Sequence, residues 1–133
     1  MSGAAENLTI ARRYLKAIEA GASGGEIAQF FAPEVVVEIF PSRFFPRGSR
    51  DDLAGICAAA ERGKKAMSGQ TYTIKNEVAS EDRVALEVDW VGTLAMAFQN
   101  IPQGGQMRAH FAMFLEFKNG KIVSQRNYDC YEE

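Results

Sequence analysis

The sequence predicts an α+β fold in which three helices in the first half of the chain pack on one strongly curved antiparallel sheet. Residues 7–67 carry apolar side chains mainly at helical spacing, whereas residues 71–131 tend to alternate apolar and polar side chains. The pair Asn119-Gly120 separates two of these alternating runs and is a strong hairpin signal. Helices followed by hairpin-connected strands are typical of α+β proteins. A long, bent sheet can fold over its helices as a cone-shaped α+β barrel with a central pocket.

Length and composition bound the class of protein. The chain has 133 residues, of which 47% are apolar and 24% are charged. This balance is ordinary for one globular domain, here 1–133 with its core at about 7–131. The formal net charge of −2 supplies no positive field that would collect phosphates. Nucleic acid and anionic membranes are therefore not expected as partners.

Cysteine and histidine usage excludes a thiolate–imidazole zinc site. Cys57 and Cys130 lie far apart and are expected to be buried free thiols, and His110 is the single histidine. We expect neither a metal nor a cofactor. The first 20 residues carry charges where a signal peptide is apolar, and no run approaches about 20 apolar residues. The expected location is cytoplasmic.

Individual elements follow from spacing, caps and turns. Helices are expected over 7–20, in a short segment between Ser23 and Pro33, and from a cap at Ser49 and Asp52 to about residue 67. Strands are expected over 35–40, 71–79, 83–96, 106–117 and 121–131, with 41–50 as a loop. Alternation along 83–96 places Trp90 on the core face and Asp89 on the opposite face.

Three segments in this order are similar to a known group of proteins. They are ARRYLKAIEAG (11–21), FFAPEVVVEIFP (30–41) and FKNGKIVSQRNYDCY (117–131), with Gly48 leading into the third helix. Together they resemble the nuclear-transport-factor-like superfamily, which includes ketosteroid isomerases, SnoaL-like polyketide cyclases and limonene epoxide hydrolase. The resemblance covers about residues 7–131. It implies a cone with an apolar pocket, a fold that hosts many chemistries.

The isomerase pattern is incomplete when it is carried over residue by residue. The isomerase tyrosine falls on Tyr14. The isomerase base falls on Ile39 or Phe40, and the protonated acid falls near Met113, where the catalytic aspartate of the polyketide cyclases also falls. Apolar side chains at these positions cannot transfer a proton. Isomerase chemistry by that mechanism is therefore not expected.

The epoxide hydrolase pattern is matched no better. It resembles Glu87-Val88-Asp89, its second aspartate falls on Asn127, and its water-holding residues fall on Val37 and Ile39. Strand parity points Asp89 away from the pocket, because a slip of one residue would bury every charge on that strand.

By the isomerase register, the last strand supplies the polar side chains of the pocket. Gln125, Asn127 and Asp129 are then expected to face inward, with Asp129 as general base and Gln125 and Asn127 as ligand-binding residues. Tyr14 is expected to stabilise negative charge on a ligand oxygen. The alternatives are a reversed register, or an Asp129 that only caps the strand end.

The rest of the ligand site is expected to be apolar. Trp90, Met113 and Phe40 are the expected wall residues, although plain core packing explains them as well. The ligand would be an apolar molecule carrying one or two oxygens, of polyketide, steroid or terpenoid type. One function that stays open is a cofactor-free isomerase, cyclase or hydrolase. The others are a non-catalytic ligand-binding or accessory dimeric domain, and a dimeric scaffold whose pocket is filled by its own side chains.

The opposite, convex face of the sheet is the expected dimer interface. Glu87, Asp89, Arg108 and His110 alternate onto this face, and a two-fold axis would pair them across two copies. The superfamily resemblance also implies a homodimer through this face.

Overall fold

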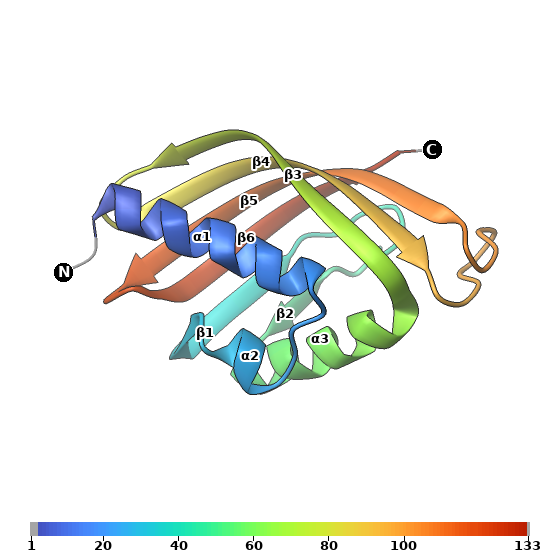
Figure 1. Cartoon of the computed structure of the whole chain (residues 1–133), viewed down its shortest axis with the longest axis horizontal. Helices are drawn as coiled ribbons and strands as arrows, with labels where there is room; N and C mark the ends of the chain where they lie inside the picture. The colour runs from blue at the N-terminus through green and yellow to red at the C-terminus, as the bar shows by residue number, and fades with distance from the viewer. Residues whose placement is uncertain (1–2, 133) are drawn as a thin grey trace.

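The computed structural model of the protein describes residues 3–132. The helices are α1 (Ala4–Glu19), α2 (Gly25–Ala28) and α3 (Leu53–Ala66). The strands are β1 (Phe31–Ile39), β2 (Ser49–Asp51), β3 (Met67–Ala79), β4 (Arg83–Leu94), β5 (Gln106–Lys118) and β6 (Lys121–Tyr131). The fold class expected from the sequence is confirmed, because the three helices pack on one curved, unclosed sheet of six strands (Figure 1).

The sheet has the strand order β2-β1-β6-β5-β4-β3. Neighbouring strands are antiparallel except for β1 and β6, which are parallel. A parallel pair is possible here because no hairpin joins the two strands, and the rest of the sheet lies between them in sequence. Register shifts between Ile74 and Asn76 and at the start of β6 add local twist to the sheet.

The helices lie on the concave side of the bend. Figure 1 shows α1 running across the front of the sheet, whereas α2 and α3 lie beside β1. The buried face of α1 carries Ala11, Tyr14 and Leu15, as the helical spacing predicts. Among residues 3–132, no helix is both long enough and apolar enough to span a bilayer.

Strand parity is confirmed on the two central strands. On β4 the side chains of Val84, Leu86, Val88 and Trp90 are buried. On β5 the buried side chains are Met107, Ala109, Phe111, Met113, Leu115 and Phe117. Both sets point into the cone, and the alternate residues face outward.

Three local expectations are wrong. Ser23 makes no cap, because Gly24 lies at the N-terminus of α2 with a positive φ of 54°. Ser49 pairs with Ile39 in β2, and Asp52 alone caps α3 by accepting a hydrogen bond from the Gly55 amide at 2.9 Å. Cys130 is exposed, because it alternates with the inward-facing residue before it.

A glycine makes the unexpected strand possible. At Gly48, with φ of 62°, a Cβ would lie 2.3 Å from the carbonyl oxygen of Ile39. Only a residue without a side chain lets the chain turn back this tightly, so the 41–50 segment ends in β2 instead of staying a loop.

Candidate functional site

A row of four hydrogen-bonded polar side chains runs from α1 to the end of β6, and we call it the polar row. The Tyr14 hydroxyl donates to Gln125 Oε1 at 2.8 Å, and Gln125 Nε2 donates to Asn127 Oδ1 at 2.9 Å. Asn127 Nδ2 in turn donates to Asp129 Oδ1 at 3.3 Å. Gln125 and Asn127 are only 4% and 5% exposed. Each buried amide is therefore satisfied by its neighbours in the row.

A bulge in β6 decides which residues of this strand face the cone. Ile122 is buried on the concave side, and regular alternation from it would turn Ser124 and Arg126 inward. Instead Phe117 pairs with Ile122 and Glu116 pairs with Ser124, so one extra residue of β6 lies between these pairs. The extra residue shifts the parity, and the polar row faces the cone.

Asp129 ends the row in a partly buried environment. Burial raises the pKa of its carboxyl from 3.8 to about 6, and the hydrogen bond from Asn127 opposes this rise. Phe111 lies directly opposite on β5, and Tyr131 lies two residues further along β6 on the same face. Asp129 and Tyr131 are both partly exposed, so solvent reaches this end of the row.

Two tyrosines that sequence reasoning missed lie near Asp129. Burial, and then the charge of Asp129, raises the pKa of Tyr131 above its usual range. Burial raises the pKa of Tyr72 most, followed by the charges of Tyr14, Asp129, Tyr131 and Glu19. Parity from Asp129 could have identified Tyr131. Nothing in the sequence signals Tyr72, which comes from β3 at the far edge of the sheet.

Aromatic side chains from two loops meet Tyr131 and form an aromatic rim, defined here as Phe44, Phe45, Phe98 and Tyr131. Phe44 and Phe45 follow β1, and Phe98 follows β4. The ring centroids of Phe44 and Phe98 are 5.9 Å apart, and those of Phe45 and Phe98 are 6.2 Å apart. Tyr131 packs edge-on against Phe44 at 5.1 Å. The rim therefore borders the Asp129 end of the polar row.

The expected wall residues separate into two groups. Met113 lies opposite Asn127 on β5 and is buried. Trp90 is buried too, and its Nε1 donates to Gln70 Oε1 at 3.0 Å. These two residues back the polar row as part of a continuous core cluster. Phe40 lies apart from the row, because its ring stacks on the exposed Tyr128 at 4.5 Å.

Two depressions stand out on the surface of residues 3–132, and both lie outside the cone. One, of about 430 Å³, is lined by Ala112, Phe114, Arg126 and Tyr128 on the convex face. The other, of about 360 Å³, is lined by Val36, Arg50, Asp51 and Asp52 at the start of α3. The buried apolar cluster of the core lies under α1. A ligand would therefore reach the polar row at its partly exposed end, beside the rim.

His110 and Asp89 lie on the convex face, as parity predicts. His110 Nδ1 is 2.9 Å from Asp89 Oδ1, and Nε2 is 3.1 Å from Glu132 Oε2. The hydrogen bond to Asp89 is the main cause of a raised pKa of the imidazole. Neither residue contributes to the polar row.

The fold and the inward-facing polar row define a class of small α+β cone proteins that enclose polar groups in an apolar interior. The sequence profile of the SnoaL-like domain family matches residues 11–125. This chain therefore belongs to the SnoaL-like domain family, as its sequence segments suggested. A search of curated protein sequences finds no match.

Solved structures show the same fold at low sequence identity. AclR of Streptomyces galilaeus, provisionally described as a hydroxylase, is 23% identical with a TM-score of 0.76, over 94% of this chain and 75% of that chain. IdmH of Streptomyces antibioticus, provisionally described as a polyketide cyclase, is 19% identical with a TM-score of 0.76, over 92% and 91%. A protein of Catenulispora acidiphila described as having a ketosteroid isomerase-like fold, in complex with trimethylamine, is 16% identical with a TM-score of 0.67, over 90% of this chain and 83% of that chain.

Proposed function

We propose that this protein binds a small apolar, oxygenated molecule beside the aromatic rim, and that Asp129 exchanges a proton with it. The observation that carries the proposal is the Asp129 carboxyl, partly buried at the end of a hydrogen-bonded row, with its pKa raised to about 6. A base works best when its pKa lies near the working pH. Similar structures described as polyketide cyclases and hydroxylases support a compound of polyketide type.

The proton step needs only groups that the chain supplies. The ionised Asp129 takes a proton from a carbon next to a ligand carbonyl. The C–H electron pair moves into the new carbon–carbon double bond, and the carbonyl oxygen becomes an enolate oxygen. A hydroxyl of Tyr72 or Tyr131 donates a hydrogen bond to that oxygen. Returning the proton from Asp129 to the same or another carbon completes an exchange or an isomerisation.

Tyr14 acts as a positioning residue in this proposal. Its hydroxyl is buried and donates to Gln125, so two amides separate it from Asp129. A tyrosine hydroxyl that donates to Gln125 Oε1 fixes which way the Gln125 amide points. The orientation of Gln125 then sets that of Asn127, which donates to the carboxylate.

A deuterium-exchange assay tests the proton step without knowledge of the natural substrate. The probe is 2-tetralone, an apolar ketone with exchangeable hydrogens beside its carbonyl, and proton NMR in heavy water follows the loss of their signal. The exchange rate should rise with pH through about 6 as Asp129 ionises. Asp129→Asn should lower the protein-dependent rate at least about 100-fold, the usual contribution of a general base.

Tyr14→Phe and Asp89→Asn complete the assay. Tyr14→Phe should lower the rate less than Asp129→Asn and displace the midpoint of its pH profile, because the row loses its first donor. Asp89→Asn removes a carboxylate on the convex face and should leave the exchange rate and its pH profile unchanged. A fully active Asp129→Asn variant would rule out the proposed base.

A second candidate function is a non-catalytic ligand-binding or accessory domain. The apolar side chains at Ile39 and Met113 favour it, since the resemblance implies proton-transfer groups there. The position of both described depressions outside the cone favours it as well. If 2-tetralone exchanges no faster with the protein than without it, this candidate becomes the better account.

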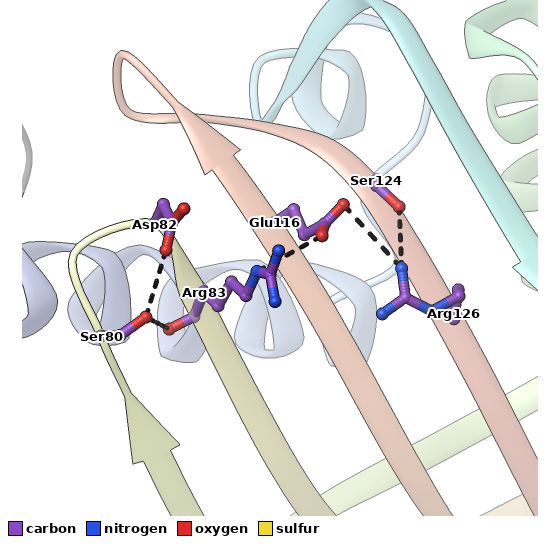
Figure 2. A network of polar contacts seen from close by, with 6 residues as sticks. All are labelled: Ser80, Asp82, Arg83, Glu116, Ser124 and Arg126. Carbon is purple, nitrogen blue, oxygen red and sulfur yellow. Dashed lines mark hydrogen bonds and ion pairs between the residues drawn. The ribbon is translucent and has the colours of Figure 1, made fainter.

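We further propose that two copies of the chain associate through the convex face of the sheet. Phe114 and Tyr128 are exposed there at 38% and 47%, with their rings in edge contact at 5.8 Å. Charges of both signs border this aromatic centre. Figure 2 shows Glu116 between Arg83 and Arg126. Its Oε1 lies 3.4 Å from Arg83 Nε, and its Oε2 lies 3.8 Å from Arg126 Nη1. A patch with an apolar centre and both charges at its edge can complement itself across a two-fold axis.

Light scattering of a matched pair of variants tests the dimer. Phe114→Glu places like charges at the centre of the proposed interface and should convert the dimer to a monomer. Met96→Glu changes another exposed apolar side chain, 56% exposed in the loop that follows β4, and should leave the dimer intact. A wild-type protein that is monomeric at micromolar concentration would rule out this interface.

A further inference from the structure

Within residues 3–132, no cationic side chain balances the negative charge of the Asp129 carboxylate. Among residues 3–132, the ion pairs involve other carboxylates, and no lysine, arginine or histidine pairs with Asp129. Its protein partner is the Asn127 amide, at 3.3 Å. Partly buried charges in proteins are usually paired, since burial without a counter-charge costs free energy. An ionised Asp129 therefore attracts a cation from solution.

The surroundings of Asp129 are of the kind that receives organic cations. Phe111, Tyr131 and Tyr72 belong to one group of aromatic rings, with centroids 6.2 Å apart for both Phe111–Tyr131 and Tyr72–Phe111. Trp90 extends the group and lies 6.1 Å from Tyr131. Aromatic faces attract cations within about 6 Å, most strongly where water is excluded. A carboxylate beside several rings combines both attractions.

The rim already holds one cation of the chain itself. The guanidinium carbon of Arg43 lies 4.9 Å from the centroid of the Phe44 ring. Arg43 is exposed, and its Nη1 donates to the main-chain oxygen of Glu132 at 3.0 Å, so it does not neutralise Asp129. The contact shows that the rim accepts a positive charge against its rings.

We propose that Asp129, with the rings of Tyr131, Tyr72 and Phe111, forms a site for an organic ammonium group, so that the ligands of this protein include apolar molecules carrying a positively charged nitrogen. The inference rests on the site of the proposed function, but it requires no reaction there. It adds a positive charge to the features expected of the ligand, since a neutral oxygenated compound would not form an ion pair with the Asp129 carboxylate.

A pair of probes with the same shape isolates the effect of the charge. Choline and 3,3-dimethylbutan-1-ol differ in one atom, a positively charged nitrogen in place of a carbon. Neither absorbs where tryptophan is excited, so the fluorescence of Trp90, the only tryptophan of the chain, can follow both titrations. Calorimetry measures the same affinities independently. Choline should bind at least about tenfold more tightly than the alcohol, a gain within the range of cation–aromatic attraction plus a charge pair.

Two variants and one control assign the preference to this site. Asp129→Asn keeps an oxygen that can accept from Asn127 and should reduce the preference for choline to less than about twofold. Tyr131→Leu should weaken choline several-fold and leave the alcohol nearly unchanged. Asp89→Asn should behave as the wild type, since its carboxylate lies on the convex face beside His110.

Three outcomes would overturn the proposal: equal affinities of the two probes for the wild type, no saturable binding of choline, or a preference that survives Asp129→Asn. The exchange assay with 2-tetralone is independent of these titrations. If the protein prefers choline but does not accelerate exchange, the proposed reaction is ruled out and the ammonium site stands. If it accelerates exchange but does not prefer choline, the ammonium site is ruled out and the proposed reaction stands.

Discussion

Replacing Phe111 with alanine is expected to lower the free energy of unfolding by about 3–5 kcal/mol, as for other buried phenylalanines. The side chain is 6% exposed and lies at the centre of the ring cluster, with its centroid 5.4 Å from that of Trp90. Truncation removes apolar surface from the core and leaves a cavity next to Asp129. Neighbouring strands hold the surrounding rings, so the cavity cannot collapse completely.

Urea unfolding of Phe111→Ala and Phe45→Ala measures this effect against a matched control. Phe45 is a phenylalanine of the rim that is 45% exposed, and its truncation should cost about 1 kcal/mol or less. Equal losses for the two variants would contradict the assignment of Phe111 to the concave core.

Asp129→Asn is expected to stabilise the protein, and the gain should depend on pH. Below about pH 3.8 the carboxyl is protonated in both the folded and unfolded states, so the two proteins should be about equally stable. Between pH 3.8 and 6 the unfolded state releases its proton first, and the wild type loses stability as the pH rises. Above about pH 6 both states are ionised, and the cost of holding the charge in the fold stays constant.

The expected gain for the asparagine variant is about 1–2 kcal/mol at pH 8, once the partial exposure of Asp129 is taken into account. Urea unfolding at pH 3.5, 6 and 8 would trace the change. A gain that is the same at all three values would show that burial does not perturb the carboxyl. A loss of stability at pH 8 would mean that the carboxylate is favourably paired in the folded state.

Most of the fold could be predicted because its helices, strands and hairpins are specified by residues close together in the sequence. Helical spacing in α1 and alternation on β4 each require one buried face, and Asn119-Gly120 fixes the β5–β6 hairpin with φ of 53° and 76°. The parallel pairing of β1 with β6 could not be predicted in this way. This pairing depends on contacts between segments far apart in the sequence, and no turn sequence indicates such contacts.

The site was only partly predictable, for two physical reasons. Alternation counted from Ile122 assigns the wrong face to Asp129, because the bulge that corrects the parity leaves no composition signal. Family resemblance supplied the correct register. Tyr72 approaches Asp129 because the sheet bends, and curvature cannot be read from the weakly alternating residues of β3. The sequence analysis noted Gly48, but it did not predict β2, the strand that this glycine makes possible.

The parallel pairing of β1 and β6 also links the strand of the site to a contact between distant segments of the chain. Phe31 pairs with Ile122, so β1 must wait for nearly the whole chain before it finds its place in the sheet. Contacts between such distant segments require the closure of a very long loop, and proteins that depend on them fold slowly. The strand that completes this pairing is also the strand that carries Asn127 and Asp129. The strand that holds β1 in the sheet is therefore the same strand that bears the cost of burying the charge of Asp129.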